Sequence, residues 1–344
     1  MATTATKVII PPEGIFRTVF LYVGQGEATL MAIPDGKRHI IALIDSNKDE
    51  SLGGINLPQL FSDLNRKIDV FINTHPHSDH LKGIKEISEQ VNIAEIWHSG
   101  HTPGKDHKES YDELQEVIDN VTEDGIITLE GTRSDLFLGD VSYNILAPAE
   151  YVSDEIDGED DDARYRRIHE QCSVLRFCYG SPDAACILVT GDSDLSAWRN
   201  HITDYHKDRI PAVILSASHH GSRTFFKDEE EDDPYTDHIE IINASYVVIS
   251  SPKQDESRHG HPHDDALEIY KEYFDEENIL HLGANRECVI VDIAADGSID
   301  VYFDKELVEE YGYKGGDGGG SNSSADKKFA MPYTYTAIDR KPMG

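Results

Sequence analysis

The sequence contains no apolar run of the length that a membrane-spanning helix needs. Its first residues, Met1 to Lys7, also lack the basic segment and apolar stretch typical of a secretory signal peptide. Positive charge is scarce, since 31 Lys and Arg residues stand against 65 Asp and Glu, a formal net charge of −34. Such a surplus disfavours anionic membranes and non-specific DNA binding, so a polyanionic substrate would need local cations or metal ions. These features predict a soluble protein without membrane contact.

Cysteine is also scarce, and none of the four cysteines belongs to a Cys-x-x-Cys pair. They are Cys172, Cys178, Cys186 and Cys288, and their neighbours are apolar residues of expected strands. Small buried thiols of this kind are typical of proteins in a reducing compartment. The sequence therefore predicts four reduced core cysteines in a cytoplasmic protein.

Residues 74–80 carry the densest group of reactive side chains, His75, His77, Asp79 and His80, in the pattern His-x-His-x-Asp-His. Imidazole and carboxylate are ligands that zinc accepts at short distance. The β-branched run before them, residues 68–73, predicts a buried strand, and apolar residues at helical spacing follow. The motif should therefore lie in a loop at the end of a strand, where it could supply ligands for two adjacent metal ions.

The chain contains four further motifs. In chain order they are Val-Gly-Gln-Gly-Glu-Ala at 23–28, before the histidine motif, and Leu-Val-Thr-Gly-Asp at 188–192, Ser-His-His-Gly-Ser at 218–222 and Gly-His-Pro at 260–262, after it. With these motifs the chain resembles the metallo-β-lactamase fold superfamily over roughly residues 15–303. Within it, the chain is most similar to the hydrolase domain of the bacterial competence DNA-channel protein and its soluble relatives. The resemblance implies an α/β fold, the αββα four-layer sandwich.

We expect one hydrolase domain over residues 1–310 and a C-terminal tail over 311–344, which is flexible or docked on a partner. The run from Gly315 to Ser321 has the composition of a flexible linker. Two acidic insertions, at 154–162 and 228–233, should be exposed to solvent. The insertions and the tail are the segments through which we expect a protein partner to bind.

Residue patterns also predict the secondary structure along the chain. A capping box, Ser110 to Glu113, should begin one helix, and others should span 193–205 and 264–274. Strands are expected at 15–23, 28–33, 39–44, 68–73, 93–97, 126–129, 141–146, 174–179, 185–190, 210–216, 246–251, 288–293 and 298–303.

The resemblance implies a dinuclear metal centre with a hydroxide between the two ions. His75, His77 and His169 would bind the first metal; Asp79, His80 and His261 would bind the second; Asp192 would bridge them. His169 is proposed because it precedes Ser173 by four residues, as the ligand does in the wider superfamily. Two zinc ions are expected from the histidine-rich set, with manganese as the alternative.

Other residues near these motifs keep two interpretations each. Asp45, after the third strand, would orient the metal loop or cap its own loop. Asp192 would bridge the metals or cap the helix after it. His219 and His220 would join Asp79 as catalytic residues by donating a proton or stabilising negative charge, or else would bind metal.

Residues that would contact substrate are less sharply indicated. His98, His101 and His107 should lie at the rim of the site, and the choice of His101 over His169 as a ligand stays open. Arg223, Lys227, Arg258 and Arg286 lie near the motifs and would bind phosphate oxygens or serve as ordinary surface charges.

The function that the resemblance implies is metal-dependent hydrolysis, foremost as a phosphodiesterase or nuclease acting on nucleic acid or nucleotides. Two alternatives stay open: a hydrolase of a carbon ester, lactone, amide or small phosphodiester, and a partner-gated or non-enzymatic subunit of a defence or DNA-processing complex.

Overall fold

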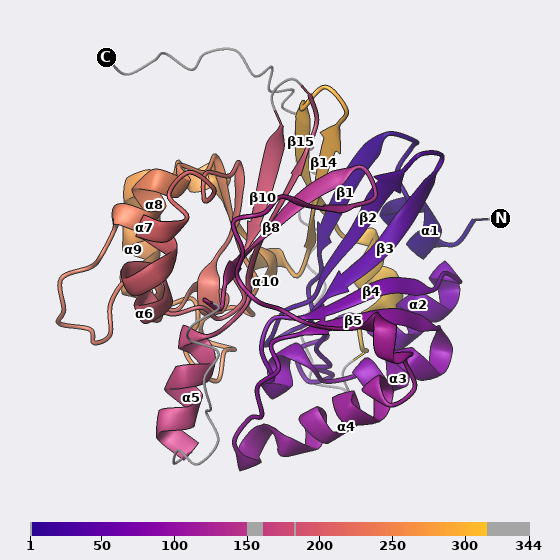
Figure 1. The fold of residues 1–344 in the computed structure, drawn as a ribbon, viewed down its shortest axis with the longest axis horizontal. Helices are drawn as coiled ribbons and strands as arrows, with labels where there is room; N and C mark the ends of the chain where they lie inside the picture. Colours follow the sequence, from indigo (N-terminus) through magenta and orange to yellow (C-terminus); the bar gives the residue numbers. More distant parts are fainter. Residues whose placement is uncertain (1, 150–160, 182–183, 315–344) are drawn as a thin grey trace.

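The computed structural model describes residues 2–149, 161–181 and 184–314, in which two β-sheets lie face to face with helices on both outer sides (Figure 1). Most of the first acidic insertion, 154–162, and most of the predicted tail, 311–344, lie outside the described residues. The second acidic insertion, residues 228–233, is exposed as predicted. The two facing sheets, with helices on their outer sides, confirm the predicted αββα sandwich.

The first sheet has eight strands in the order β15-β14-β1-β2-β3-β4-β5-β6. Neighbours from β15 to β3 run antiparallel, and those from β3 to β6 run parallel. Their bounds are β1 Ile15–Phe20, β2 Thr29–Asp35, β3 Arg38–Ile44, β4 Ile68–Asn73, β5 Ile93–His98, β6 Ile126–Thr128, β14 Cys288–Ala294 and β15 Ile299–Asp304.

The second sheet has seven strands in the order β13-β12-β11-β10-β9-β8-β7. The strands from β10 to β13 are parallel, and β7 to β10 are antiparallel. Their bounds are β7 Leu136–Leu138, β8 Val141–Ala147, β9 Val174–Tyr179, β10 Ala185–Val189, β11 Ile214–Ser216, β12 Tyr246–Ile249 and β13 Ile279–His281.

Helices cover the outer faces of both sheets, and α5 projects at the lower end of the sandwich in Figure 1. A five-residue π-helical segment, 198–202, separates α6 from α7. The α-helices are α1 Thr4–Ile9, α2 Leu57–Leu64, α3 Ile84–Gln90, α4 Lys108–Ile118, α5 Asp161–Glu170, α6 Leu195–Ala197, α7 Thr203–Tyr205, α8 Asp237–Ile242, α9 Asp264–Tyr273, α10 Leu282–Asn285 and α11 Glu306–Tyr311.

Three hydrophobic clusters separate the four layers, and strand alternation divides the side chains among them. In β4, Phe71 packs toward the helices α2 and α3, while Val70 and Ile72 pack between the sheets. In β10, Ile187 faces the first sheet and Leu188 faces the helices of the other side. Both sheets are therefore buried on two faces, which explains their nearly continuous apolar runs.

The parallel strands of both sheets end at the same end of the sandwich. β4 leads into the metal motif, β10 into Gly191 and Asp192, and β11 into the His219–His220 pair. Polar loops at the carboxyl ends of parallel strands are where α/β proteins place ligand sites. The fold thus brings the motifs together although they are far apart in the sequence.

Two predicted helix starts are wrong. Helix α4 begins at Lys108 rather than at Ser110, which is buried within the helix. The helix after β10 is capped by Asp194, whose side chain accepts a hydrogen bond from the Ala197 amide, and not by Asp192. In each case a polar residue two places from the true start resembled a cap, and helix ends are the part of a prediction most easily misplaced by one or two residues.

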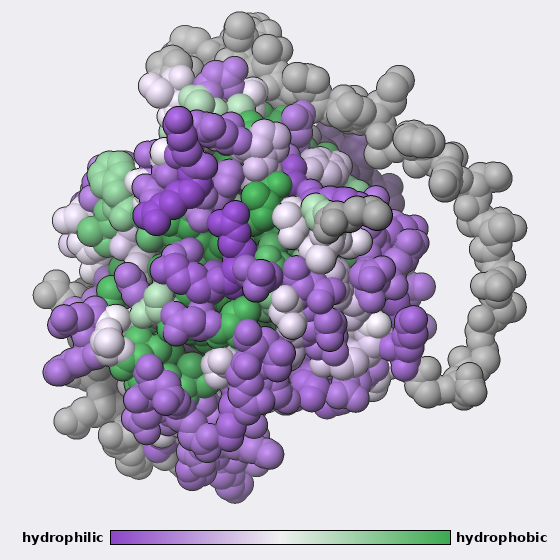
Figure 2. Space-filling model, turned by 90° about the vertical axis from the view of Figure 1, so that its right-hand side faces the viewer, coloured by the Kyte–Doolittle hydropathy of each residue, from purple (hydrophilic) through white to green (hydrophobic). Residues whose placement is uncertain are grey.

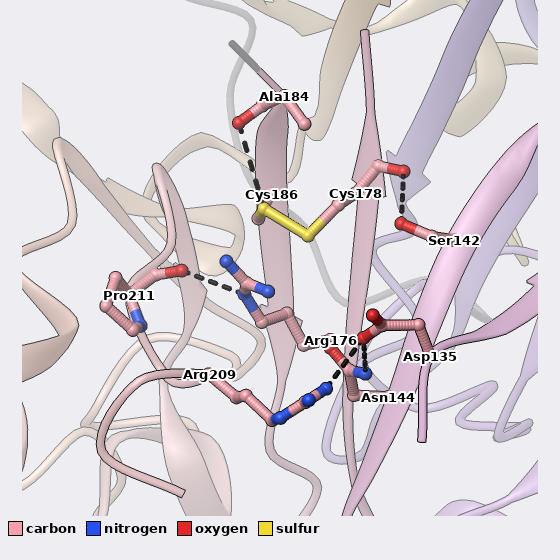
Figure 3. The surroundings of a disulfide bond; sticks show 9 residues. All are labelled: Asp135, Ser142, Asn144, Arg176, Cys178, Ala184, Cys186, Arg209 and Pro211. Atoms are coloured by element: carbon pink, nitrogen blue, oxygen red, sulfur yellow. Dashed lines mark hydrogen bonds and ion pairs between the residues drawn. A yellow bond between two sulfur atoms is a disulfide. The ribbon is translucent and has the colours of Figure 1, made fainter. Parts of the chain in front are cut away.

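The prediction of four reduced cysteines is wrong for one pair, because Cys178 and Cys186 form a disulfide (Figure 3). They lie directly opposite each other on the antiparallel strands β9 and β10, with Cα atoms 4.1 Å apart. Close cross-strand pairing, which the eight-residue spacing alone does not reveal, makes the bond geometrically accessible. Cys172 and Cys288 are buried free thiols, as predicted.

The surface is strongly polar, and hydrophilic side chains dominate the face in Figure 2, around a smaller hydrophobic region. No helix in the described segments is both long and apolar enough to cross a bilayer. Among the exposed large hydrophobic side chains is Tyr165 on α5, which is 42% exposed.

We expect Gly26→Ala to cost much more stability than Gly36→Ala. Both glycines have positive φ, but a Cβ at Gly36 meets nothing, whereas one at Gly26 would collide with the Asp79 carbonyl oxygen. The control should lose about 1–2 kcal/mol of unfolding free energy from its backbone conformation. Overpacking adds about 1–3 kcal/mol to that loss at Gly26. Equal losses in urea unfolding would contradict this contact.

We expect the Cys178→Ala/Cys186→Ala double variant to lose about 2.5 kcal/mol of unfolding free energy, the cost of opening a short cross-linked loop. Reducing agent should produce the same loss in the wild-type protein and none in the variant. A wild-type mass that does not change on reduction would show that the pair is not bonded.

Candidate metal centre

A buried carboxylate, Asp45, ties the end of β3 to the motif loop. It accepts hydrogen bonds from the Thr74 amide at 2.8 Å and the Thr74 hydroxyl at 2.6 Å. Its Oδ2 also lies 2.7 Å from His80 Nδ1. An imidazole that donates from Nδ1 to a carboxylate keeps its Nε2 lone pair for a ligand. These contacts are those expected of a residue that orients a metal-binding histidine.

The first ligand group consists of His75, His77 and His169, whose ligand atoms lie within 4.8 Å of one another. The Nε2 atoms of His75 and His77 are buried and have no hydrogen-bond partner among the described residues. Burial lowers the pKa of His77 to about 3 and holds that of His75 well below its usual value. Neutral imidazoles with unused nitrogen atoms fit a divalent ion such as zinc.

His169 reaches this group from the last turn of α5, a helix that the sequence analysis did not predict. Its Nε2 lies 3.1 Å from His77 Nδ1. His101 is not among the residues of this group. The geometry thus favours His169 over His101 at this position, although its role as a ligand stays a prediction.

Asp192 stands at the centre of the cluster, immediately after β10. Because Asp194 caps the following helix, the Asp192 carboxylate is left to face the histidines. Burial alone would raise its pKa, but the surrounding histidines, with His80 contributing most, together hold the pKa of Asp192 well below its usual range. Its oxygens lie 3.1 Å from His80 Nε2, 3.5 Å from His219 Nε2 and His220 Nε2, 3.6 Å from His75 Nε2 and 3.9 Å from His169 Nε2.

The second ligand group contains Asp79, His80 and His220. His220 Nδ1 donates to the Ser250 carbonyl at 2.8 Å, so its Nε2 is free to bind a ligand. That Nε2 lies 3.6 Å from Asp79 Oδ2. The structure therefore places His220, one of the residues left open by the sequence, where the predicted ligand set had His261.

His261 lies beside this group, with ring centres 5.2 Å from His219 and 6.0 Å from His220. Burial lowers the pKa of His261 to about 2, and its Nδ1 has no hydrogen-bond partner among the described residues. His261 therefore remains a candidate ligand.

His219 has a different environment from its neighbour. Its backbone is in the left-handed region, with φ +50, and its Nδ1 lies 3.0 Å from the Thr224 hydroxyl. It belongs to a further group with His169 and Asp192. Its side chain, which is 12% exposed, reaches the cavity, which suits proton transfer to or from a bound molecule.

A cavity of about 410 Å³ opens over the two ligand groups. Lys82 and Arg258 line it, and neither forms an ion pair among the described residues. Its full lining is Gln25, Asn47, Lys48, Asp49, His77, Ser78, Asp79, Lys82, Asp106, His107, Tyr165, Asp192, His219, His220, Arg258, His259 and His261.

The other candidate phosphate-binding cations are held by acidic partners. Lys227 lies 2.9 Å from Asp265, and Arg223 lies 3.1 Å from the same carboxylate. Arg286 lies 2.8 Å from Glu256. Of the four cations indicated by the sequence, Arg258 is the one that lines the cavity.

The three histidines predicted at the rim, His98, His101 and His107, also differ in whether they line the cavity. His107 lines the cavity and stacks on His77, with ring centres 4.2 Å apart. His98 accepts a hydrogen bond from the Gly100 amide instead, and His101 is buried. Neither His98 nor His101 is among the residues of the cavity wall.

Several residues of the site were not identified from the sequence, among them Lys82, Tyr165 and Glu27. Lys82 carried no signal beyond its place after the motif, and Tyr165 is positioned by the unpredicted helix α5. Glu27 belongs to the Gly-Gln-Gly motif, which was noted without a role for its acidic residue. Burial raises the pKa of Glu27 to about 7.

The αββα sandwich places groups of histidine and aspartate side chains that could hold metal ions at the end of its sheets. Residues 41–147 match the family model described as the metallo-beta-lactamase superfamily, which is less than a third of the chain. The match covers β3 to β8, including the motif loop but not Asp192 or His220. No curated protein matches the chain.

Solved structures of low identity also resemble the chain. A metallo-beta-lactamase superfamily protein from Sulfolobus tokodaii has 16% identity and a TM-score of 0.29, covering 53% of this chain and 64% of its own, so the chain spans less than two thirds of that relative. A putative metal-dependent hydrolase from Parabacteroides distasonis has 11% identity and a TM-score of 0.37, covering 77% and 92%. The Rm3 metallo-beta-lactamase has 11% identity and a TM-score of 0.33, covering 90% and 94%. Similarities this weak add nothing about activity or substrate.

We expect the His220→Ala variant to bind about one metal ion per chain instead of two, and the His261→Ala variant to bind both. His220 Nε2 faces Asp79 and Asp192, whereas His261 lies one ring further out. Metal content after gel filtration measures the difference, with circular dichroism to verify folding. Loss of metal from His261→Ala alone would restore the assignment made from the sequence.

Proposed function

We propose that this protein is a dinuclear-metal-dependent hydrolase that cleaves phosphodiesters. The observation that supports the proposal most strongly is the cavity itself. It joins two buried histidine–aspartate groups to Arg258 and Lys82, two cations without acidic partners in the described part of the chain. Phosphate oxygens are the ligands that such cations recognise best.

The first group, with His75, His77 and His169, would hold one metal ion, and the second, with Asp79, His80 and His220, the other. Asp192 lies between the groups and offers two oxygens. When bound, two divalent ions supply a water nucleophile at neutral pH and positive charge for the oxygens of the reacting group. Zinc suits the histidine-rich donors, and manganese is the alternative.

The protein's own residues would then orient the substrate and handle protons. Asp45 fixes His80 through its Nδ1, so that Nε2 faces Asp192. Arg258 and Lys82 would hold the non-reacting phosphate oxygens. His219 reaches the cavity and lies 3.5 Å from Asp192, a suitable place from which to donate a proton to the leaving oxygen.

Charge bears on the kind of phosphodiester. The net charge of −34 repels a long polyanion, and Asp49 and Asp106 stand in the cavity wall beside the cations. A nucleotide or the end of a nucleic acid would place fewer negative charges against this surface than a continuous duplex. We therefore favour nucleotides and strand ends as substrates.

We expect Arg258→Ala to raise KM for a chromogenic phosphodiester by about 10–100-fold, since a hydrogen bond to a charged group contributes about 1.5–3 kcal/mol. Metal content should not change. Arg286→Ala is the matched control because Glu256 already pairs with that guanidinium, and its KM should stay within about twofold.

Asp192→Ala should abolish the cleavage while the protein stays folded, which tests the metal site separately from the cations. A panel containing phosphodiesters, single- and double-stranded nucleic acids, carboxylic esters and lactones decides the reaction class. Turnover of lactones alone would overturn the phosphodiesterase proposal and support hydrolysis of a carbon ester on the same groups.

A further inference from the structure

We propose that the carboxylate of Glu27 is an additional metal ligand of this centre, acting with Asp192 and His220 on the side nearest the β1–β2 turn. The inference rests on the proposed dinuclear centre and adds a third carboxylate to it. It does not depend on which substrate is cleaved.

Glu27 is fixed in position by the loop that precedes β2. Its amide donates to the carbonyl oxygen of Asp79 at 3.2 Å, so the turn lies directly against the metal motif. The neighbouring Gly26 allows that approach, because any side chain there would collide with the same carbonyl. Two segments that are distant in the sequence are thereby held in contact at the site.

The side chain points into the interior between the two sheets. Glu27 is 1% exposed, and its Oε1 accepts a hydrogen bond from the Ser216 hydroxyl at 3.1 Å. Ser216 is the last residue of β11, just before the loop that carries His219 and His220. The carboxylate therefore faces the ends of the second sheet, where Asp192 also lies.

Within the described segments, no lysine or arginine forms an ion pair with Glu27. A buried carboxylate is costly unless a positive group or a metal ion compensates it. The Ser216 hydroxyl satisfies one of the roughly four acceptor positions that a carboxylate offers. A neighbouring divalent ion would supply the missing positive charge.

The geometry around Glu27 fits such an ion. Its ligand oxygen, an Asp192 oxygen and a His220 nitrogen all lie within 4.8 Å of one another. Two ligands of one tetrahedral ion stand roughly 3.5 Å apart, given ligand distances of roughly 2.0–2.2 Å. Small side-chain shifts would bring all three groups onto a single ion.

Glu27→Gln tests the proposal because it keeps the shape and hydrogen bonding of the side chain but removes its charge. Zinc and manganese are titrated separately into metal-free protein by calorimetry. We expect the weaker-binding equivalent to lose at least about 10-fold in affinity, as changes around metal ligands do. Ser216→Ala is the control: it removes the hydrogen bond but keeps the carboxylate, and should still bind two ions.

The stability of the metal-free protein separates a ligand from a structural residue. A ligand role predicts that metal-free Glu27→Gln unfolds at the same urea concentration as wild type or a higher one, since a buried charge is gone. Glu27→Asp should recover part of the affinity. Wild-type affinity in Glu27→Gln, or weaker binding together with a destabilised metal-free state, would overturn the proposal.

The same titration distinguishes this inference from the proposed reaction. Wild-type protein that binds two ions but cleaves no phosphodiester would refute the phosphodiesterase proposal and leave the role of Glu27 intact. If the wild-type protein cleaves phosphodiesters and Glu27→Gln still binds both ions at wild-type affinity, the role of Glu27 is refuted and the phosphodiesterase proposal is kept.

Discussion

The hydrogen bonds accepted by Asp45 are the constraint on which the site depends. One carboxylate, buried at the end of β3, holds the Thr74 amide and hydroxyl and the Nδ1 of His80. The Ser46 amide then donates to the His80 carbonyl at 3.0 Å. The loop after β4 therefore has one conformation, in which its histidines turn toward the second sheet and not toward solvent. A flexible loop would lose conformational entropy each time it became ordered around a ligand.

Much of this arrangement is predictable from the sequence because it is local. The run from Ile68 to Asn73 defines a buried strand, and the density of histidines after it identifies the loop that the structure places at the site. The end of β10 at Gly191 and Asp192 follows from the same reasoning. In each case the strand and the reactive residues are contiguous in the sequence, so the apolar pattern that predicts the strand also predicts where those residues lie.

The features that the sequence did not predict or decide depend on contacts between distant segments. Helix α5, which carries His169, was not predicted because its sequence is too charged to show an apolar face. The Cys178–Cys186 bond depends on strand register. The choice between His220 and His261, and the position of Glu27, depend on how the second sheet packs on the first. No window of sequence contains that information.

The location of the centre between the sheets also has a kinetic consequence. His75 and His80 follow a strand of one sheet, while Asp192 and His220 follow strands of the other, so each of the two proposed ligand groups combines residues that are distant in the sequence. Contacts between segments so distant in the sequence form late, after the loop-closure entropy has been overcome. In the proposed dinuclear centre, tight binding of both ions would therefore report that folding is complete, and a chain released during synthesis before β11 has emerged would not bind both.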